Sequence, residues 1–299
     1  MRKGNLMSVR HDVRVLDATI RDGGLCNNFE FSDEFVSELY KTNIKCGVDY
    51  MEFGYRASRN LFDEDEHGKW KFCKEEDIRA IVGDNNTEMK ISVMADVGRC
   101  DYKNDFISKE DSVIDMVRVA CYIHQIPSAV EMINYLSELG YETTCNIMAI
   151  SQASFNQIDD ALAMLGESKV DVIYLVDSYG ALVPESTIEL TKKYLEYGEK
   201  FGKQIGFHGH NNQKLAFANT IESLSYGASF VDATAISGPA YKKRVWSASR
   251  ERVDPRTFVI ARDLKPNSFI FTKAARISAV SPLCDINMNS GFFGIIGIL

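Results

Sequence analysis

Residues 17–24 read Asp-Ala-Thr-Ile-Arg-Asp-Gly-Gly, and residues 206–212 read Gly-Phe-His-Gly-His-Asn-Asn. Each segment continues a short β-prone run, at residues 13–16 and 203–207, and passes at once into a polar turn that contains glycine. The polar residues are therefore predicted to stand where a strand ends. A fold that brings these two strand ends together would place one carboxylate beside two imidazoles.

The spacing of His208 and His210 allows both side chains to bind the same metal ion. Successive side chains of an extended chain point to opposite faces, so residues two apart lie on the same side and can reach one ion. A helix would need a spacing of three or four. A solitary loop histidine is usually only solvated, but the pair together with Arg-Asp-Gly at residues 21–23 indicates a divalent-metal site.

Together these segments resemble the metallolyase and aldolase group of TIM barrels, which includes hydroxymethylglutaryl-CoA lyase, isopropylmalate synthase and 4-hydroxy-2-oxovalerate aldolase. The resemblance rests on residues 17–23 and 208–212, followed by Leu-Ala-Phe-Ala-Asn-Thr at 215–220. The longer stretch Arg-Asp-Gly-Gly-Leu-Cys-Asn-Asn-Phe-Glu-Phe at 21–31 is most similar to the aldolase branch.

The resemblance implies an α/β fold, a TIM (β/α)8 barrel, with Asp22, His208 and His210 as metal ligands and Arg21 as the group that stabilises an enolate. It implies a metal-dependent aldolase, a carbon–carbon lyase that cleaves a 4-hydroxy-2-oxo acid through a metal-bound enolate. The family favours Mn²⁺ or Mg²⁺ for such a donor set, which could also hold Zn²⁺. The alternatives are an acyl-CoA-dependent Claisen synthase of the same fold and a catalytically silent metal-binding barrel.

Strand-like and helix-like stretches alternate along the chain, which is typical of βα units on a parallel sheet. Eight strands are expected, near residues 13–16, 51–54, 91–95, 116–119, 144–148, 172–177, 207–208 and 230–233. Helices are expected from Ser32 toward Lys45, from Ser128, over 157–165 and from Pro184.

The chemistry of such a barrel lies at the carboxyl ends of its strands. Polar residues at or just after the expected strand ends are therefore candidates: Glu52, Arg56, Asp96, Arg99, Arg118, Asn146, Asp177 and Ser178. Glu52, next to Arg21 in barrel order at the second strand end, is expected to assist catalysis as a partner of Arg21 or of metal-bound water. Arg56, Asn146 and Asp177 are expected to bind the substrate. The alternative for any one of them is a loop residue that satisfies backbone groups, or a structural ion pair.

The composition, 299 residues with 45% hydrophobic and 25% charged, is that of an ordinary globular protein. It favours one catalytic domain, placed at residues 1–236. The substrate that the resemblance implies is a small 2-oxo acid. A net charge of −8 argues against nucleic-acid binding. Seven cysteines without a C-x-x-C pair indicate reduced thiols. The lack of a secretory signal or a bilayer-length apolar run predicts a cytoplasmic protein without a membrane partner, and homo-oligomerisation is left open.

The chain departs from the family pattern in two places. Gly24 and Leu25 stand where some members carry His or Tyr, so the general base has no obvious candidate. After Ala233 the pattern normally continues into a Gly-rich loop with an Asn, but residues 236–244 read Ile-Ser-Gly-Pro-Ala-Tyr-Lys-Lys-Arg.

Composition changes at the same point, because residues 237–299 hold ten Lys and Arg against four Asp and Glu, a balance of +6, and four of the six prolines. This segment is either a divergent C-terminal extension with a basic face or a stretch that does not derive from the ordinary coding sequence of the family. We expect residues 230–233 to pair as the eighth strand and most of 241–299 to pack loosely.

Overall fold

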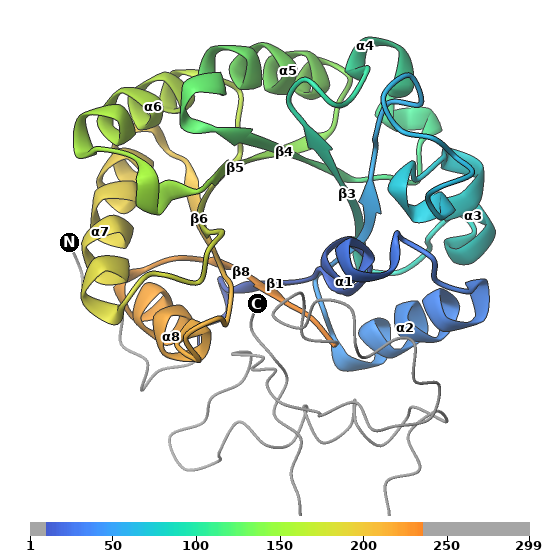
Figure 1. The fold of residues 1–299 in the computed structure, drawn as a ribbon, viewed down its shortest axis with the longest axis horizontal. Coiled ribbons are helices and arrows are strands. Elements are labelled where there is room, and N and C mark those ends of the chain that lie inside the picture. The colour runs from blue at the N-terminus through green and yellow to red at the C-terminus, as the bar shows by residue number, and fades with distance from the viewer. Residues whose placement is uncertain (1–9, 236–299) are drawn as a thin grey trace, which may run out of the picture.

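The computed structural model describes residues 10–235, which form a closed barrel of eight parallel strands in sequence order (Figure 1). The strands are β1 (Arg14–Asp17), β2 (Tyr50–Tyr55), β3 (Lys90–Asp96), β4 (Met116–Tyr122), β5 (Glu142–Met148), β6 (Val172–Asp177), β7 (Gln204–Gly209) and β8 (Phe230–Ala233). Hydrogen bonding between β8 and β1 closes the barrel. The TIM-barrel prediction and all eight predicted strands, including residues 230–233, are therefore confirmed.

The helices are α1 (Thr19–Asn27), α2 (Asp33–Cys46), α3 (Glu75–Val82), α4 (Tyr102–Asp105), α5 (Ile126–Glu138), α6 (Phe155–Glu167), α7 (Pro184–Phe201) and α8 (Ala216–Tyr226). Most of them surround the barrel and cover the outer face of the sheet, whereas α1 lies inside their ring, next to the strands (Figure 1). Four short 3-10 turns complete the described elements: η1 (Lys69–Lys71), η2 (Lys109–Asp111), η3 (Ile123–Gln125) and η4 (Ile150–Gln152).

Local signals explain where the helices begin. The hydroxyl of Ser32 accepts a hydrogen bond from the backbone N–H of Phe35 and caps α2, and α7 begins at Pro184, as the sequence predicts. The helix expected from residue 128 begins earlier, at Ile126, because Pro127 is well placed in a first turn that needs no backbone donor.

The polar turn expected after the first strand is a helix instead. Residues 19–27 form α1, although Gly23 and Gly24 lower helix propensity. Tertiary packing outweighs that propensity, since residues 19–24 are buried. A Cβ atom at Gly24 would lie 2.1 Å from the ring of Phe29, so the glycine lets this ring close over the helix. Asn28 then ends α1 in the left-handed conformation with a φ of 55°.

The inside of the barrel is layered. Near the amino ends of the strands the interior side chains are apolar: Leu16, Tyr50, Met116, Val172 and Phe230. Further toward the carboxyl ends they are charged: Glu52, Arg118, His208 and Asp232. The position of Glu52 in the middle of β2 corrects the expectation that it stands at the strand end.

No helix within residues 10–235 is long and apolar enough to cross a membrane. No disulfide joins any two of the six cysteines in this range. The expectations for residues 237–299, including their loose packing, lie outside the described residues.

Candidate metal centre

Three of the predicted site residues converge at the carboxyl end of the barrel. Asp22 lies in the first half of α1, His208 lies near the end of β7, and His210 follows that strand. One ligand atom from each lies within 4.8 Å of the others, and Asp22 Oδ2 is 3.8 Å from His208 Nε2. Ligand bonds of about 2.0–2.3 Å place two ligand atoms at most about 4.6 Å apart. The three side chains would therefore need to move very little to hold one ion.

The partners of the two imidazoles leave the ligand atoms free. His208 Nδ1 lies 2.7 Å from Asp232 Oδ2, and His210 Nδ1 lies 2.9 Å from the carbonyl oxygen of Asp177. Because a carboxylate and a carbonyl can only accept, both Nδ1 atoms donate and both Nε2 atoms keep their lone pairs. Asp22 Oδ2 is buried without a hydrogen-bond partner. These three atoms, Asp22 Oδ2 and the two Nε2 atoms, are therefore free to bind a divalent cation.

Arg118 ties two parts of the site together. It is fully buried and donates from Nη1 to Glu52 Oε2 at 2.9 Å and from Nη2 to Asp232 Oδ2 at 2.5 Å. Burial alone would raise the pKa of Asp232, but Arg118 and His208 outweigh burial and hold this pKa at about 2. Asp232 therefore remains a carboxylate, able to orient His208.

Glu52 and Asp22 fix the catalytic candidate Arg21. Its Nε donates to Glu52 Oε2 at 2.9 Å, and its Nη1 forms an ion pair with Asp22 Oδ1. Burial would lower the pKa of Arg21, but the carboxylates of Asp22 and Glu52 raise it well above its ordinary value. Arg21 is thus a permanently charged group beside a metal-ligand candidate.

The three residues expected to bind substrate have structural partners. Asp177 accepts from the backbone N–H groups of Ala181 and Leu182. The Arg56 guanidinium donates to the carbonyl oxygens of Cys73 and Asp105, so both residues satisfy loop backbone. Asn146 is buried, and its Oδ1 accepts from the hydroxyl of Thr144 at 2.8 Å. Their role in substrate binding remains a prediction.

Asp232 was not among the sequence candidates. The signal for it was a carboxylate within an otherwise apolar strand, Phe-Val-Asp-Ala at residues 230–233. The same signal marks Arg118 within Met-Val-Arg-Val at residues 116–119. Charged residues are rarely fully buried unless they are paired, so such positions point to a partner inside the barrel.

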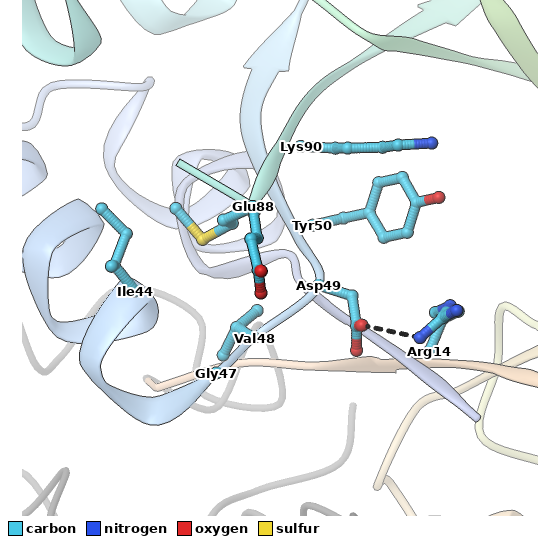
Figure 2. A pocket seen from close by; sticks show the side chains of 9 residues that line it. Arg14, Ile44, Gly47, Val48, Asp49, Tyr50, Glu88 and Lys90 are labelled. Carbon is cyan, nitrogen blue, oxygen red and sulfur yellow. Dashed lines mark hydrogen bonds and ion pairs between the residues drawn. The ribbon is translucent and has the colours of Figure 1, made fainter. Parts of the chain in front are cut away.

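The other end of the barrel is different. A cavity of about 390 Å³ opens where β1, β2 and β3 begin (Figure 2). Three of its charged side chains are paired, with Arg14 Nη1 3.3 Å from Asp49 Oδ1 and Lys90 Nζ 2.7 Å from Glu142 Oε2. The amino end of a TIM barrel contributes to stability, whereas chemistry resides at the carboxyl end. We therefore place the candidate site around Asp22.

The fold and these side chains define a TIM barrel with a candidate metal centre at its carboxyl end. Residues 12–238 match the HMGL-like family, and the chain belongs to that family.

Two relatives agree with this assignment, and a solved structure shares the fold. The chain is 28% identical over 230 residues to a 4-hydroxy-2-oxovalerate aldolase of Geobacillus thermodenitrificans, covering 76% of this chain and 64% of that protein. It is 26% identical over 239 residues to an oxaloacetate decarboxylase of Mycobacterium tuberculosis, covering 77% and 66%. The matched part thus spans less than two thirds of these relatives. The crystal structure of the HMG-CoA lyase from Brucella melitensis shares the fold, with a TM-score of 0.59, 15% identity and coverage of 75% and 81%.

Proposed function

We propose that this protein is a divalent-metal-dependent aldolase that cleaves a 4-hydroxy-2-oxo acid to pyruvate and an aldehyde. The observation that carries the proposal is the convergence of Asp22, His208 and His210 at the carboxyl end of the barrel, with Arg21 beside them. Membership of the HMGL-like family supports it, and so does the similarity to proteins named as an aldolase and a decarboxylase of 2-oxo acids.

Asp22, His208 and His210 would hold the ion. Oxygen and imidazole donors without a thiolate suit Mn²⁺ or Mg²⁺, and the same three donors could also hold Zn²⁺. When bound, such an ion would supply Lewis-acid polarisation of the ketone of the substrate.

Arg21 would stabilise the negative charge that develops on the ketone oxygen as the carbon–carbon bond breaks. Its guanidinium is oriented from two sides, by Glu52 and by Asp22, so it needs little reorganisation when the charge forms. Its planar fork can donate two parallel hydrogen bonds, which an ammonium group cannot imitate. Glu52 would contribute by holding this orientation.

A second reaction at the same site is the decarboxylation of oxaloacetate. The relative from Mycobacterium tuberculosis named as an oxaloacetate decarboxylase favours it. Loss of carbon dioxide from oxaloacetate and cleavage of a 4-hydroxy-2-oxo acid both leave the enolate of pyruvate. Arg21 would serve both reactions in the same way.

The test is to incubate the metal-free protein with Mn²⁺ and a panel of 4-hydroxy-2-oxo acids and to follow pyruvate with lactate dehydrogenase. We expect pyruvate release that requires the added metal and ceases with excess chelator. The variant His210→Ala is the matched control and should lose both Mn²⁺ binding and activity. Tight Mn²⁺ binding without pyruvate from any member of the panel would contradict the proposal.

A further inference from the structure

Cleavage of a 4-hydroxy-2-oxo acid requires a group that accepts the proton of the hydroxyl. Most acidic and basic side chains at the carboxyl end of the barrel already have partners or a proposed metal-binding role: Asp22, His208, His210, Glu52, Asp177 and Asp232. Glu52 and Asp232 each keep one oxygen without a partner, but Arg118 binds the other oxygen of both. The candidate for the proton acceptor is therefore a side chain that no such close ion pair holds.

Asp96 is such a side chain. It is the last residue of β3, and Ile91, Val93 and Ala95 of this strand belong to the core between sheet and helices. Since side chains alternate along a strand, Asp96 faces the barrel interior, on the same side as Ser92. Ser92 is the register partner of Glu52 on β2. The Asp96 side chain therefore lies on the same interior face of the barrel as Glu52.

One carboxylate oxygen of Asp96 has no partner. Its Oδ1 is buried and makes no hydrogen bond within residues 10–235. Its Oδ2 forms a long ion pair with Arg99 Nη1 at 4.0 Å, and the Arg99 side chain is 63% exposed. A buried carboxylate oxygen without a partner is costly to keep, and such groups concentrate at functional sites.

Lys71 lies beside Asp96 in an apolar setting. The residue is 8% exposed, and its Nζ lies over the rings of Phe62, Tyr55 and Phe29 at 4.2, 4.7 and 4.9 Å from their centroids. Lys71, Asp96 and Tyr55 line one small cleft where β2 and β3 end. The three rings hold the ammonium group in place of water.

We propose that Asp96 is the proton acceptor of the cleavage reaction and that Lys71 adjusts its basicity. This assignment rests on the proposed function. The proton of the substrate hydroxyl passes to the carboxylate of Asp96, and the electrons of the O–H bond form the carbonyl of the departing aldehyde. The carbon–carbon bond breaks, its electron pair forms the enolate that Arg21 stabilises, and this enolate takes up a proton at carbon to give pyruvate.

The electrostatic surroundings of Asp96 agree with this role. Burial raises the pKa of Asp96 above its ordinary value, while Lys71, Arg99 and Arg21 lower it and Glu52 raises it. Burial lowers the pKa of Lys71 in turn. A carboxylate with a raised pKa is a stronger base than an exposed one, and its basicity lies closer to neutral pH.

The variant Asp96→Asn separates this role from a structural one, because the two reactions of the site differ in their need for a base. Oxaloacetate loses carbon dioxide without giving up a hydroxyl proton, whereas the aldol cleavage must lose one. We expect Asp96→Asn to lower kcat for the cleavage by about 10²–10⁴-fold and to retain decarboxylation and Mn²⁺ affinity.

Asp105→Asn is the matched control. Asp105 also has a buried oxygen without a partner and a pKa that burial raises, but it lies on α4 outside the barrel. This variant should leave both reactions unchanged. Equal loss of both reactions in Asp96→Asn would make Asp96 structural, and unchanged cleavage would exclude it as the base. If the wild-type protein performed neither reaction with Mn²⁺ bound, the proposed function would fall, and this assignment with it.

Lys71→Met tests the second half of the proposal. Removing the ammonium group removes a positive charge that lowers the pKa of Asp96, so the acid limb of the pH profile of kcat/KM should move to higher pH by about one unit. An unmoved acid limb in a variant with normal Mn²⁺ affinity would exclude Lys71 from this role.

Discussion

The two ends of the barrel differ in whether their charged side chains have partners. At the amino end Arg14 pairs with Asp49, and Glu142 accepts from both Lys90 and Tyr50. None of these side chains has a buried atom without a partner. Toward the carboxyl end, buried carboxylate oxygens of strand and α1 residues lack a partner at four positions: Asp22, Glu52, Asp96 and Asp232.

This difference separates stability from function. Paired charges at the amino end are partly exposed and cost little, whereas unpaired buried oxygens at the carboxyl end destabilise the fold. Such a cost is expected where a metal ion or a substrate supplies the missing partner. The predictions below compare the two ends, beginning with the largest expected effect.

Arg118→Met should lower the free energy of unfolding by about 3–5 kcal/mol, because it leaves Glu52 and Asp232 buried without their shared cation. Denaturation with urea measures the loss. A loss below about 1 kcal/mol would show that the interior charges are solvated, and the contrast between the two ends would disappear.

Arg21→Lys should retain the metal but lower turnover by about 10²–10³-fold, because an ammonium group cannot present the planar fork of the guanidinium. Mn²⁺ titration and pyruvate release measure the two properties separately. Wild-type turnover in this variant would make Arg21 a structural residue.

Asp17→Asn removes a carboxyl group at the end of β1 whose pKa burial raises to about 6, despite hydrogen bonds from Thr19 and Asn43. The folded protein binds this proton more tightly than the unfolded chain, so its stabilising contribution is present below pH about 4 and is lost as pH rises through 6. Between these values the stability of the variant should rise relative to wild type by up to about 3 kcal/mol. A stability difference that does not change with pH would contradict this.

Asp232→Asn should weaken Mn²⁺ binding by about 10–100-fold, because the carboxylate that orients His208 becomes a neutral amide. Isothermal titration calorimetry measures the affinity. Unchanged affinity would mean that His208 needs no partner to serve as a ligand.

Lys90→Met at the amino end should change stability by less than about 1 kcal/mol and leave activity unaltered, because the lysine side chain is 49% exposed. Reduced turnover in this variant would show that the two ends are functionally coupled.

The sequence predicts the barrel, and the role of Asp22, His208 and His210 as metal ligands stays a prediction. Apolar β-prone runs that alternate with helical stretches specify βα units, and the His-x-His spacing specifies two side chains on one face of β7. The hydrogen-bond partners of these residues are harder to predict from the sequence. Asp232 reaches His208 from a neighbouring strand, and sequence alone gives no register between strands.

The sequence also misplaces some features. Residues 19–27 form a helix against the propensity of two glycines because burial stabilises it. The backbone partners of Asp177 and Arg56 come within reach only once the loops have folded, so the sequence does not reveal them. The role of both residues in substrate binding stays a prediction.

The most direct measurement of the central claim is a crystal structure of the protein soaked with Mn²⁺ and pyruvate, with diffraction data recorded at the manganese absorption edge. We predict one strong anomalous peak about 2.0–2.3 Å from Asp22 Oδ2, His208 Nε2 and His210 Nε2, with pyruvate between this peak and Arg21. A peak at another location, or no peak while these three side chains keep their positions, would contradict the proposed metal centre.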